Sequence, residues 1–228
     1  MSAHGAADHD HHHFRLHPDD VPEDAHFGTA TPGKIGMWIF LLSDALMFAG
    51  FLLAYGILRG QTEDWICTEA VSKATGCVLE PELGINFTAG LTFLLICSSV
   101  TMVLAYAAAV ENDRKGLVKF LGLTVLGGLL FLVGQYYEYF GLFGYHGLTG
   151  DGLIFGQSAY ATTFYLITSF HGAHVFSGVV YLTIIWFRSM RGDFDGGFTS
   201  EVEIVGLFWH FVDLVWILVF TLVYLVPA

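Results

Sequence analysis

Basic residues are scarce in this chain, and charged residues are few altogether. Only 9 of its 228 residues are Lys or Arg, and charged residues make up 13% of the sequence, about half the share found in ordinary soluble domains. A nucleic-acid interface needs a stripe of basic side chains to neutralise phosphates, and the sequence contains no such stripe. Nucleic acid is therefore excluded as a partner.

The N-terminal 32 residues lack the features of a targeting segment. They contain neither a basic stretch followed by an apolar run nor the Arg-rich, acid-poor composition of a mitochondrial transit peptide. Instead they hold seven of the eleven histidines together with several Asp residues. With almost no apolar residues to bury, 1–32 is predicted to be a disordered cytoplasmic tail, with adventitious metal binding as the alternative. A bacterial plasma (inner) membrane is the expected location.

Apolar residues, by contrast, are abundant and lie in long runs. They account for 54% of the chain, and five runs are long enough to cross a hydrocarbon core of about 30 Å, which takes about 20 helical residues. Only helices satisfy their own backbone groups in lipid without closing into a barrel. The sequence therefore predicts an all-α, multi-pass membrane protein, with a transmembrane domain over 33–228 and spans at about 34–58, 86–111, 117–142, 159–187 and 204–226.

The few basic residues are divided unequally between the two sides of these spans. One side carries Arg15, Lys34, Arg114, Lys115, Lys119, Arg188 and Arg191, and the other carries only Arg59 and Lys73. The positive-inside rule therefore predicts a cytoplasmic N-terminus and an extracytoplasmic C-terminus.

Cysteine is also scarce, with three in the chain. Cys67 and Cys77 fall in the longest predicted loop, 59–85, on the extracytoplasmic side, where an oxidising compartment favours a disulfide. Two free thiols are the alternative. Cys97 lies within the second span and is expected to pack as a small apolar residue.

Polar and ionisable side chains are rare within the spans. An ionisable side chain costs about 2.5–3.5 kcal/mol at the centre of a membrane helix, so such groups normally face protein or water. At 1.5 Å per residue, those of three spans reach similar depths, which predicts one interhelical layer in which Asp44 bonds to a histidine. The candidates for buried polar or proton-uptake residues are Asp44, Gln135, Glu138, His171, His174, His210 and Asp213.

The chemistry of these residues leaves two readings open. Asp44 is either a structural anchor between helices or a group that passes protons. His171 and His174 share one helix face, so they cannot ligate a haem iron from opposite sides. The histidines are expected to make hydrogen bonds between helices, and His210 and Asp213 to bond to each other. No metal site and no catalytic residue are predicted.

Four strings in the spans, taken in order, resemble subunit III of the haem–copper respiratory oxidases, in its five-helix bacterial form. The family usually has Glu at the position of Asp44, and often Glu at the position of Gln135. The strings read GKIGMWIFLLSDALMFAGFLLAY from residue 33, QYYEY from 135, TSFHGAHVFSG from 168 and WHFVDLVWILVF from 209.

The resemblance implies a non-catalytic subunit of cytochrome c oxidase, which reduces O₂ to water while pumping protons. Haem and copper then belong to partner subunits. The implied partners are subunit I as the main contact, subunit II, membrane phospholipids and a respiratory supercomplex. The implied roles are stability, lipid binding and support of proton uptake by subunit I, and an oxygen entry route has also been proposed for the family.

Two alternatives to this function stay open at the level of sequence. One is an accessory subunit of a quinol oxidase or nitric oxide reductase. The other is an independent proton or solute transporter, in which Asp44, His174 and His210 form the pathway. The basic residues Arg114, Lys115 and Arg188 are candidates for binding phospholipid headgroups, and snorkelling of their long side chains is the alternative explanation.

Overall fold

A computed structural model of the chain describes residues 31–61, 84–141, 147–148, 153–156, 158–194 and 199–225. The predicted tail and the Cys67–Cys77 bridge lie outside these ranges. The helices are α1 (Pro32–Gln61), α3 (Ile85–Val110), α4 (Arg114–Phe140), α5 (Ala159–Arg191) and α6 (Ser200–Val219), and a π-helical turn, η2 (Phe220–Leu225), continues α6. All five spans are long and apolar enough to cross a membrane, so the prediction of an all-α bundle of five long apolar helices is confirmed.

The largest differences from the predicted boundaries lie where polar residues prolong a helix beyond its apolar run. α5 continues past 187 to Arg191, and α6 begins at Ser200, four residues before the predicted start. Local capping fixes other ends: the Asp113 side chain accepts a hydrogen bond from Lys115 N at the start of α4, and Gly192 ends α5 in the left-handed conformation, which glycine adopts without strain.

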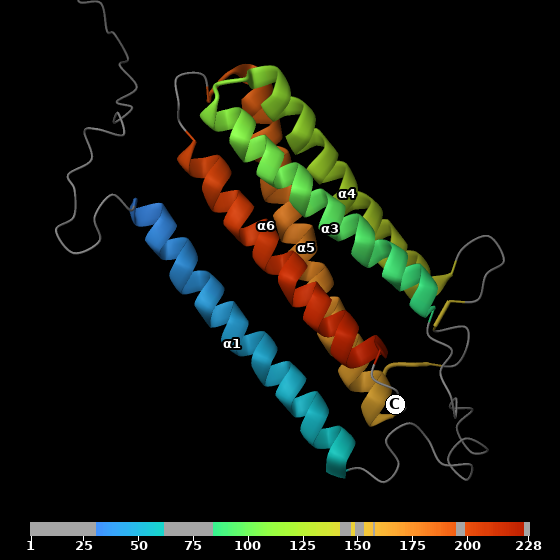
Figure 1. The fold of residues 1–228 in the computed structure, drawn as a ribbon. Coiled ribbons are helices and arrows are strands. Elements are labelled where there is room, and N and C mark those ends of the chain that lie inside the picture. The colour runs from blue at the N-terminus through green and yellow to red at the C-terminus, as the bar shows by residue number, and fades with distance from the viewer. Residues whose placement is uncertain are drawn as a thin grey trace, which may run out of the picture. The chain divides into compact units, whose positions relative to one another are not determined.

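Four of the helices form a closed group and the fifth lies on its flank. α3 packs on α4, α4 on α5, α5 on α6, and α6 returns to α3, whereas α1 packs on α5 and α6. In Figure 1, α1 runs beside α6, with α6 and α5 between it and the α3–α4 pair. We call α3, α4, α5 and α6 with η2 the closed group.

Glycines allow the helices of the closed group to approach closely. A Cβ atom at Gly127 would lie 2.8 Å from Ser98 Cβ on α3, and one at Gly128 would lie 2.6 Å from both the Trp209 ring and Val179. Small residues at such crossings are the usual means of packing membrane helices, because lipid supplies no hydrophobic drive for association.

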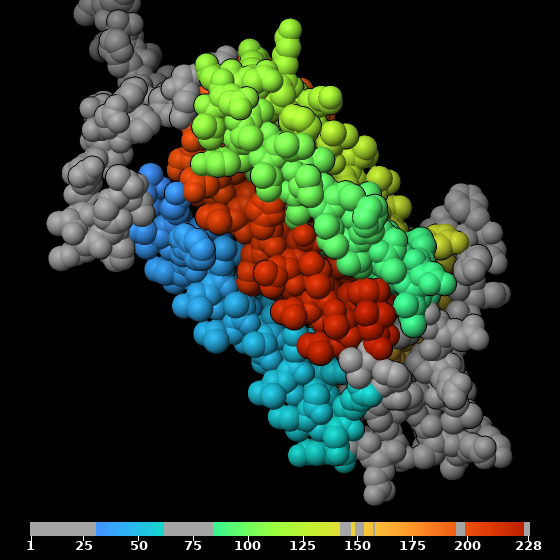
Figure 2. Space-filling model, viewed as in Figure 1, coloured from blue at the N-terminus to red at the C-terminus, as the bar shows by residue number. Residues whose placement is uncertain are grey.

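Most of the exposed surface of the five helices is apolar, as a lipid-facing surface must be. Large apolar side chains that are more than half exposed occur on every helix, for example Trp38, Phe93, Val133, Phe176 and Leu214. In Figure 2, side chains of α6 fill the strip between α1 and α3 on the visible face. Cys97 lies within the second span as predicted, but it is exposed on α3 and does not pack against the other described helices. It lies one helical turn from the exposed Phe93 and Val100, on the outer face.

One end of the bundle gathers the basic residues of the predicted cytoplasmic side. Lys34 of α1 pairs with Glu203 of α6 at 2.6 Å. Arg188 at the end of α5 pairs with Asp193 and Glu201, and Arg114 at the start of α4 donates to the Ser189 carbonyl at 3.2 Å. We call this the basic end of the bundle.

Candidate functional site

Asp44 and His174 meet where α1 packs on α5. Asp44 is buried, and its Oδ2 lies 3.1 Å from His174 Nε2, at ion-pair distance. The prediction that Asp44 hydrogen-bonds to a histidine is met only as a contact at ion-pair distance: among the described residues, Asp44 Oδ2 has no hydrogen-bond partner.

The other ring nitrogen of His174 determines how many protons this contact holds. Nδ1 lies 2.9 Å from the Phe170 carbonyl oxygen. A carbonyl can only accept, so Nδ1 carries a hydrogen and Nε2 is the nitrogen that faces the carboxyl group. A bare Nε2 would repel a carboxylate, so this contact is favourable only when Nε2 and Asp44 share one proton. Such a pair is electrically neutral whichever of the two groups holds that proton.

Aromatic rings surround the pair. The His174 ring centroid lies 5.3 Å from that of Phe48 on α1 and 4.9 Å from that of Phe170. Phe48 also meets Phe170 edge-on at 5.5 Å. These rings keep the pair in apolar surroundings, where a net charge would be costly and a neutral pair is favoured.

His171, one turn away on α5, is enclosed entirely by rings. It is fully buried, stacks on Trp216 at 4.8 Å and meets Phe131 edge-on at 6.0 Å. Neither ring nitrogen has a hydrogen-bond partner among the residues that the structure describes. The expected hydrogen bond between helices was therefore wrong for this histidine, because aromatic stacking holds its ring where no donor or acceptor reaches it.

Gln135 joins α4 to α5. Its amide nitrogen donates to the Thr168 carbonyl at 2.9 Å, and Tyr139 donates to the Thr168 hydroxyl at 2.6 Å. A Cβ atom at Gly172 would lie 2.8 Å from Gln135 Oε1, so this glycine makes room for the amide. These contacts satisfy the polar groups within the bundle, as buried groups require.

Glu138 joins three elements of the closed group. Its carboxyl accepts from the Thr88 hydroxyl of α3 at 2.7 Å and from the Tyr224 hydroxyl of η2 at 3.3 Å. Neither partner was identified from the sequence, because hydroxyls are common in membrane helices and their spacing does not reveal which helix they face.

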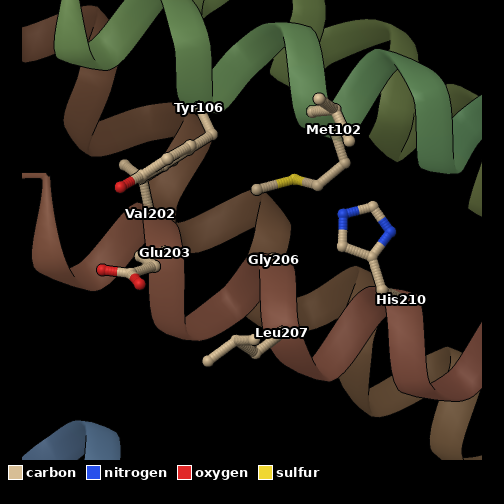
Figure 3. A pocket seen from close by; sticks show the side chains of 8 residues that line it. Met102, Tyr106, Val202, Glu203, Gly206, Leu207 and His210 are labelled. Atoms are coloured by element: carbon tan, nitrogen blue, oxygen red, sulfur yellow. The ribbon is translucent and has the colours of Figure 1, made fainter.

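Asp213 bonds to Ser99 of α3 and, among the described residues, forms no hydrogen bond with its neighbour His210. Its Oδ2 accepts from the Ser99 hydroxyl at 2.7 Å, and its Oδ1 has no hydrogen-bond partner in the described part of the chain. The predicted His210–Asp213 hydrogen bond is therefore wrong: Ser99 offers a donor from the opposite helix, and His210 points instead into a groove between α3 and α6 (Figure 3). Within the described ranges, neither residue bonds to Asp44 or His174, so the expected single layer is two separate sites.

Arg114 and Arg188, both at the basic end, differ in whether a carboxylate within the chain balances their charge. Arg114 donates to the carbonyl oxygens of Ser189 and Met190 and lines an open groove of about 480 Å³ with Lys115 and Lys119. Arg188 instead meets two carboxylates, those of Asp193 and Glu201. Its charge is therefore balanced inside the chain.

The buried polar groups do not gather into a metal site in the part of the chain that the structure describes. No three side chains of His, Cys, Asp or Glu approach one another closely enough there to hold an ion. Two of the buried carboxyls instead accept hydrogen bonds from hydroxyl groups, Glu138 from Thr88 and Asp213 from Ser99.

Comparison with known proteins covers nearly the whole described region. The family described as "Cytochrome c oxidase subunit III" matches residues 23–227. The chain is 36% identical to cytochrome c oxidase subunit 3 of Synechocystis sp., over 90% of this chain and 81% of that protein. It is 34% identical to the protein of the same name from Thermostichus vulcanus, over 84% and 86%, and 33% identical to the probable cytochrome c oxidase subunit 3 of Rickettsia felis, over 91% and 73%.

Proposed function

The chain belongs to the cytochrome c oxidase subunit III family, and from this premise we propose that it is a non-catalytic subunit that supports proton uptake and lipid binding in a terminal oxidase. It is a multi-pass membrane protein, and membership of the oxidase implies other oxidase subunits as its companions. One observation carries the non-catalytic assignment: two of the buried carboxyls are used in hydrogen bonds between helices, Glu138 with Thr88 and Asp213 with Ser99.

The proposed orientation places the basic end in the cytoplasm. Arg114, Lys115, Lys119 and Arg191 cluster there, which the positive-inside rule favours. Asp44 is twelve residues from the start of α1 at Pro32, a depth of about 18 Å at 1.5 Å per residue. In this orientation the Asp44–His174 pair lies near the middle of the membrane.

The proposed role of the Asp44–His174 pair is to hold one proton between α1 and α5. Transfer of this proton between Nε2 and Oδ2 leaves the net charge unchanged, so it avoids the cost of charging a group in apolar surroundings. A site of this kind can accept and release protons beside a neighbouring uptake path, and it also anchors α1. Replacing the Asp44 carboxyl with an amide distinguishes the two roles, because the amide can anchor α1 but cannot exchange the proton.

The groove at Arg114, Lys115 and Lys119 is the proposed site for a phospholipid headgroup. Lys115 and Lys119 are exposed, and basic grooves between helices on the cytoplasmic side favour anionic headgroups. Arg188 contributes less to this proposal because two carboxylates already balance its charge.

Purification of the intact complex in mild detergent tests the proposed function. Haem-bearing chains should co-purify with this chain in constant ratio, and identification of those chains by mass spectrometry would also show whether the electron donor is cytochrome c or a quinol. A chain that purifies alone and moves protons or solutes in liposomes would be a transporter, and the proposal would fail.

A further inference from the structure

A small apolar groove lies between α3 and α6 in the half of the bundle nearer the basic end. It has a volume of about 170 Å³, and its lining includes Met102, Val103, Tyr106, Gly206, Leu207 and His210. Figure 3 shows Met102 and Tyr106 projecting from α3, and His210 from α6. Gly206 leaves the groove open, because a Cβ atom at this position would lie 3.2 Å from the terminal methyl group of Met102.

The imidazole of His210 needs a hydrogen-bond partner from whatever occupies this groove. Its imidazole is half-buried and points toward Met102 (Figure 3), and it makes no hydrogen bond to any residue within the described ranges. Asp213, the nearest acid on the same helix, is bonded to Ser99. An imidazole facing hydrocarbon without a hydrogen bond is unfavourable, and ionisable groups in membrane helices normally face protein or water.

His210 lies too deep in the membrane for a phospholipid headgroup to supply this hydrogen bond. It lies seven residues beyond Glu203, which pairs with Lys34 at the basic end, and so about 10 Å deeper at 1.5 Å per residue. A phospholipid places its polar headgroup near the level of Glu203 and offers only methylene groups at the level of His210. An acyl chain therefore fills the groove without satisfying the histidine.

The size and surroundings of the groove favour a side chain from another helix. A volume of about 170 Å³ is smaller than the roughly 300–1,000 Å³ of pockets that take small molecules. Beside the groove, the exposed face of α3 is lined with β-branched residues, Val100, Val103 and Val110. A neighbouring helix can insert an apolar side chain over Gly206 and present a hydroxyl or amide to His210, a combination typical of helix contacts in membranes.

We propose that the α3–α6 groove is the docking surface for a transmembrane helix of a companion oxidase subunit, which inserts an apolar side chain beside Gly206 and hydrogen-bonds to His210. This inference rests on the proposed function, since it requires companion chains. It adds which face of the bundle they contact and which residue sets the register of that contact.

Site-specific photo-crosslinking in the purified complex tests the docking surface. Benzoylphenylalanine replaces Val103, which lines the groove, or Val180 on α5 as the control; the two valines are 54% and 44% exposed. The probe at Val103 should join this chain to a membrane-spanning segment of a companion subunit, and the probe at Val180 should give lipid adducts. Lipid adducts alone at Val103, a link between two copies of this chain, or equal protein adducts at both positions would each overturn the inference.

Substitution of His210 tests the hydrogen bond separately. His210→Leu should make dissociation of this chain from the complex about threefold easier, since such bonds contribute about 0.6 kcal/mol on average. His210→Gln, which keeps an N–H donor, should remain close to the original chain. Equal dissociation of the Leu variant and the original would overturn the role of His210. If companion chains never co-purify, the proposed function itself fails, whereas co-purification with lipid-only adducts refutes the docking surface alone.

Discussion

α1 and the closed group are both apolar membrane helices, yet they are held in different ways. α6 buries ten of its residues, including Trp209 and Trp216, whereas α1 buries four over a longer helix. In the closed group, glycines allow the helices to approach closely, and hydrogen bonds such as that between Glu138 and Thr88 join them. α1 is attached through a few buried side chains, Leu41, Phe48 and Tyr55, together with the Asp44–His174 contact and the Lys34–Glu203 ion pair.

This difference indicates that the closed group is the stable scaffold and that α1 is the part that can move relative to it. Local stability in a protein follows the density of buried contacts, so thinly packed elements open at lower free energy than the core. The closed group is expected to unfold as one unit, and α1 to loosen first. The Asp44–His174 contact lies at the junction of the two regions, so the proton proposed for it would lie where α1 is most easily displaced.

Truncation of one buried phenylalanine in each region should give the largest effect. Phe131→Ala in the closed group removes a fully buried ring that contacts Trp216 at 4.8 Å, and should lower the free energy of unfolding by about 3–5 kcal/mol. Phe48→Ala should instead raise hydrogen exchange in α1 more than tenfold and leave α3–α6 protected. Hydrogen exchange followed by mass spectrometry measures both. Equal loss of protection across all five helices in the Phe48 variant would remove the distinction between the two regions.

A pair of glycine substitutions should give the next largest effect. Gly128→Ala places a methyl group 2.6 Å from Trp209 and Val179, whereas Gly50→Ala on α1 meets nothing within 4 Å. Overpacking should lower stability by about 1–3 kcal/mol in the first variant. The second should be neutral or slightly stabilising, because Ala favours helix over Gly. Thermal unfolding of the detergent-solubilised complex compares them, and a Gly50 variant as unstable as the Gly128 variant would contradict the prediction.

The sequence predicts more of this fold than of its site. Length and hydropathy are properties of a segment, so they place the five helices within a few residues. The pairing of Asp44 with a histidine follows from equal depth along two helices. Partners set by helix rotation are not predictable in this way: Ser99, which binds Asp213, and Tyr224, which binds Glu138, are ordinary hydroxyls whose facing depends on packing. The same limitation explains why His210 was assigned to Asp213.

Replacement of Asp44 by Asn should give the smallest effect on stability and the clearest effect on function. The Asn amide can donate to the Nε2 that faces it at 3.1 Å in the original chain, so the contact between α1 and α5 is preserved. The change in unfolding free energy should be within about 1 kcal/mol, the range of a typical hydrogen bond. The amide cannot accept or release the shared proton, so turnover should slow or the active lifetime of the enzyme should shorten while assembly stays intact.

Asp213→Asn is the matched control for this prediction. It makes the same change to a buried carboxyl, one that bonds to Ser99 within the closed group and is not placed against His174. Turnover per assembled complex should fall for Asp44→Asn and stay near the original value for Asp213→Asn, measured as oxygen consumption normalised to haem over repeated turnovers. If Asp44→Asn instead reduces the amount of complex while each remaining complex works normally, the carboxyl anchors α1 and has no part in proton uptake. In that case α1 and the closed group differ only in how densely they are packed.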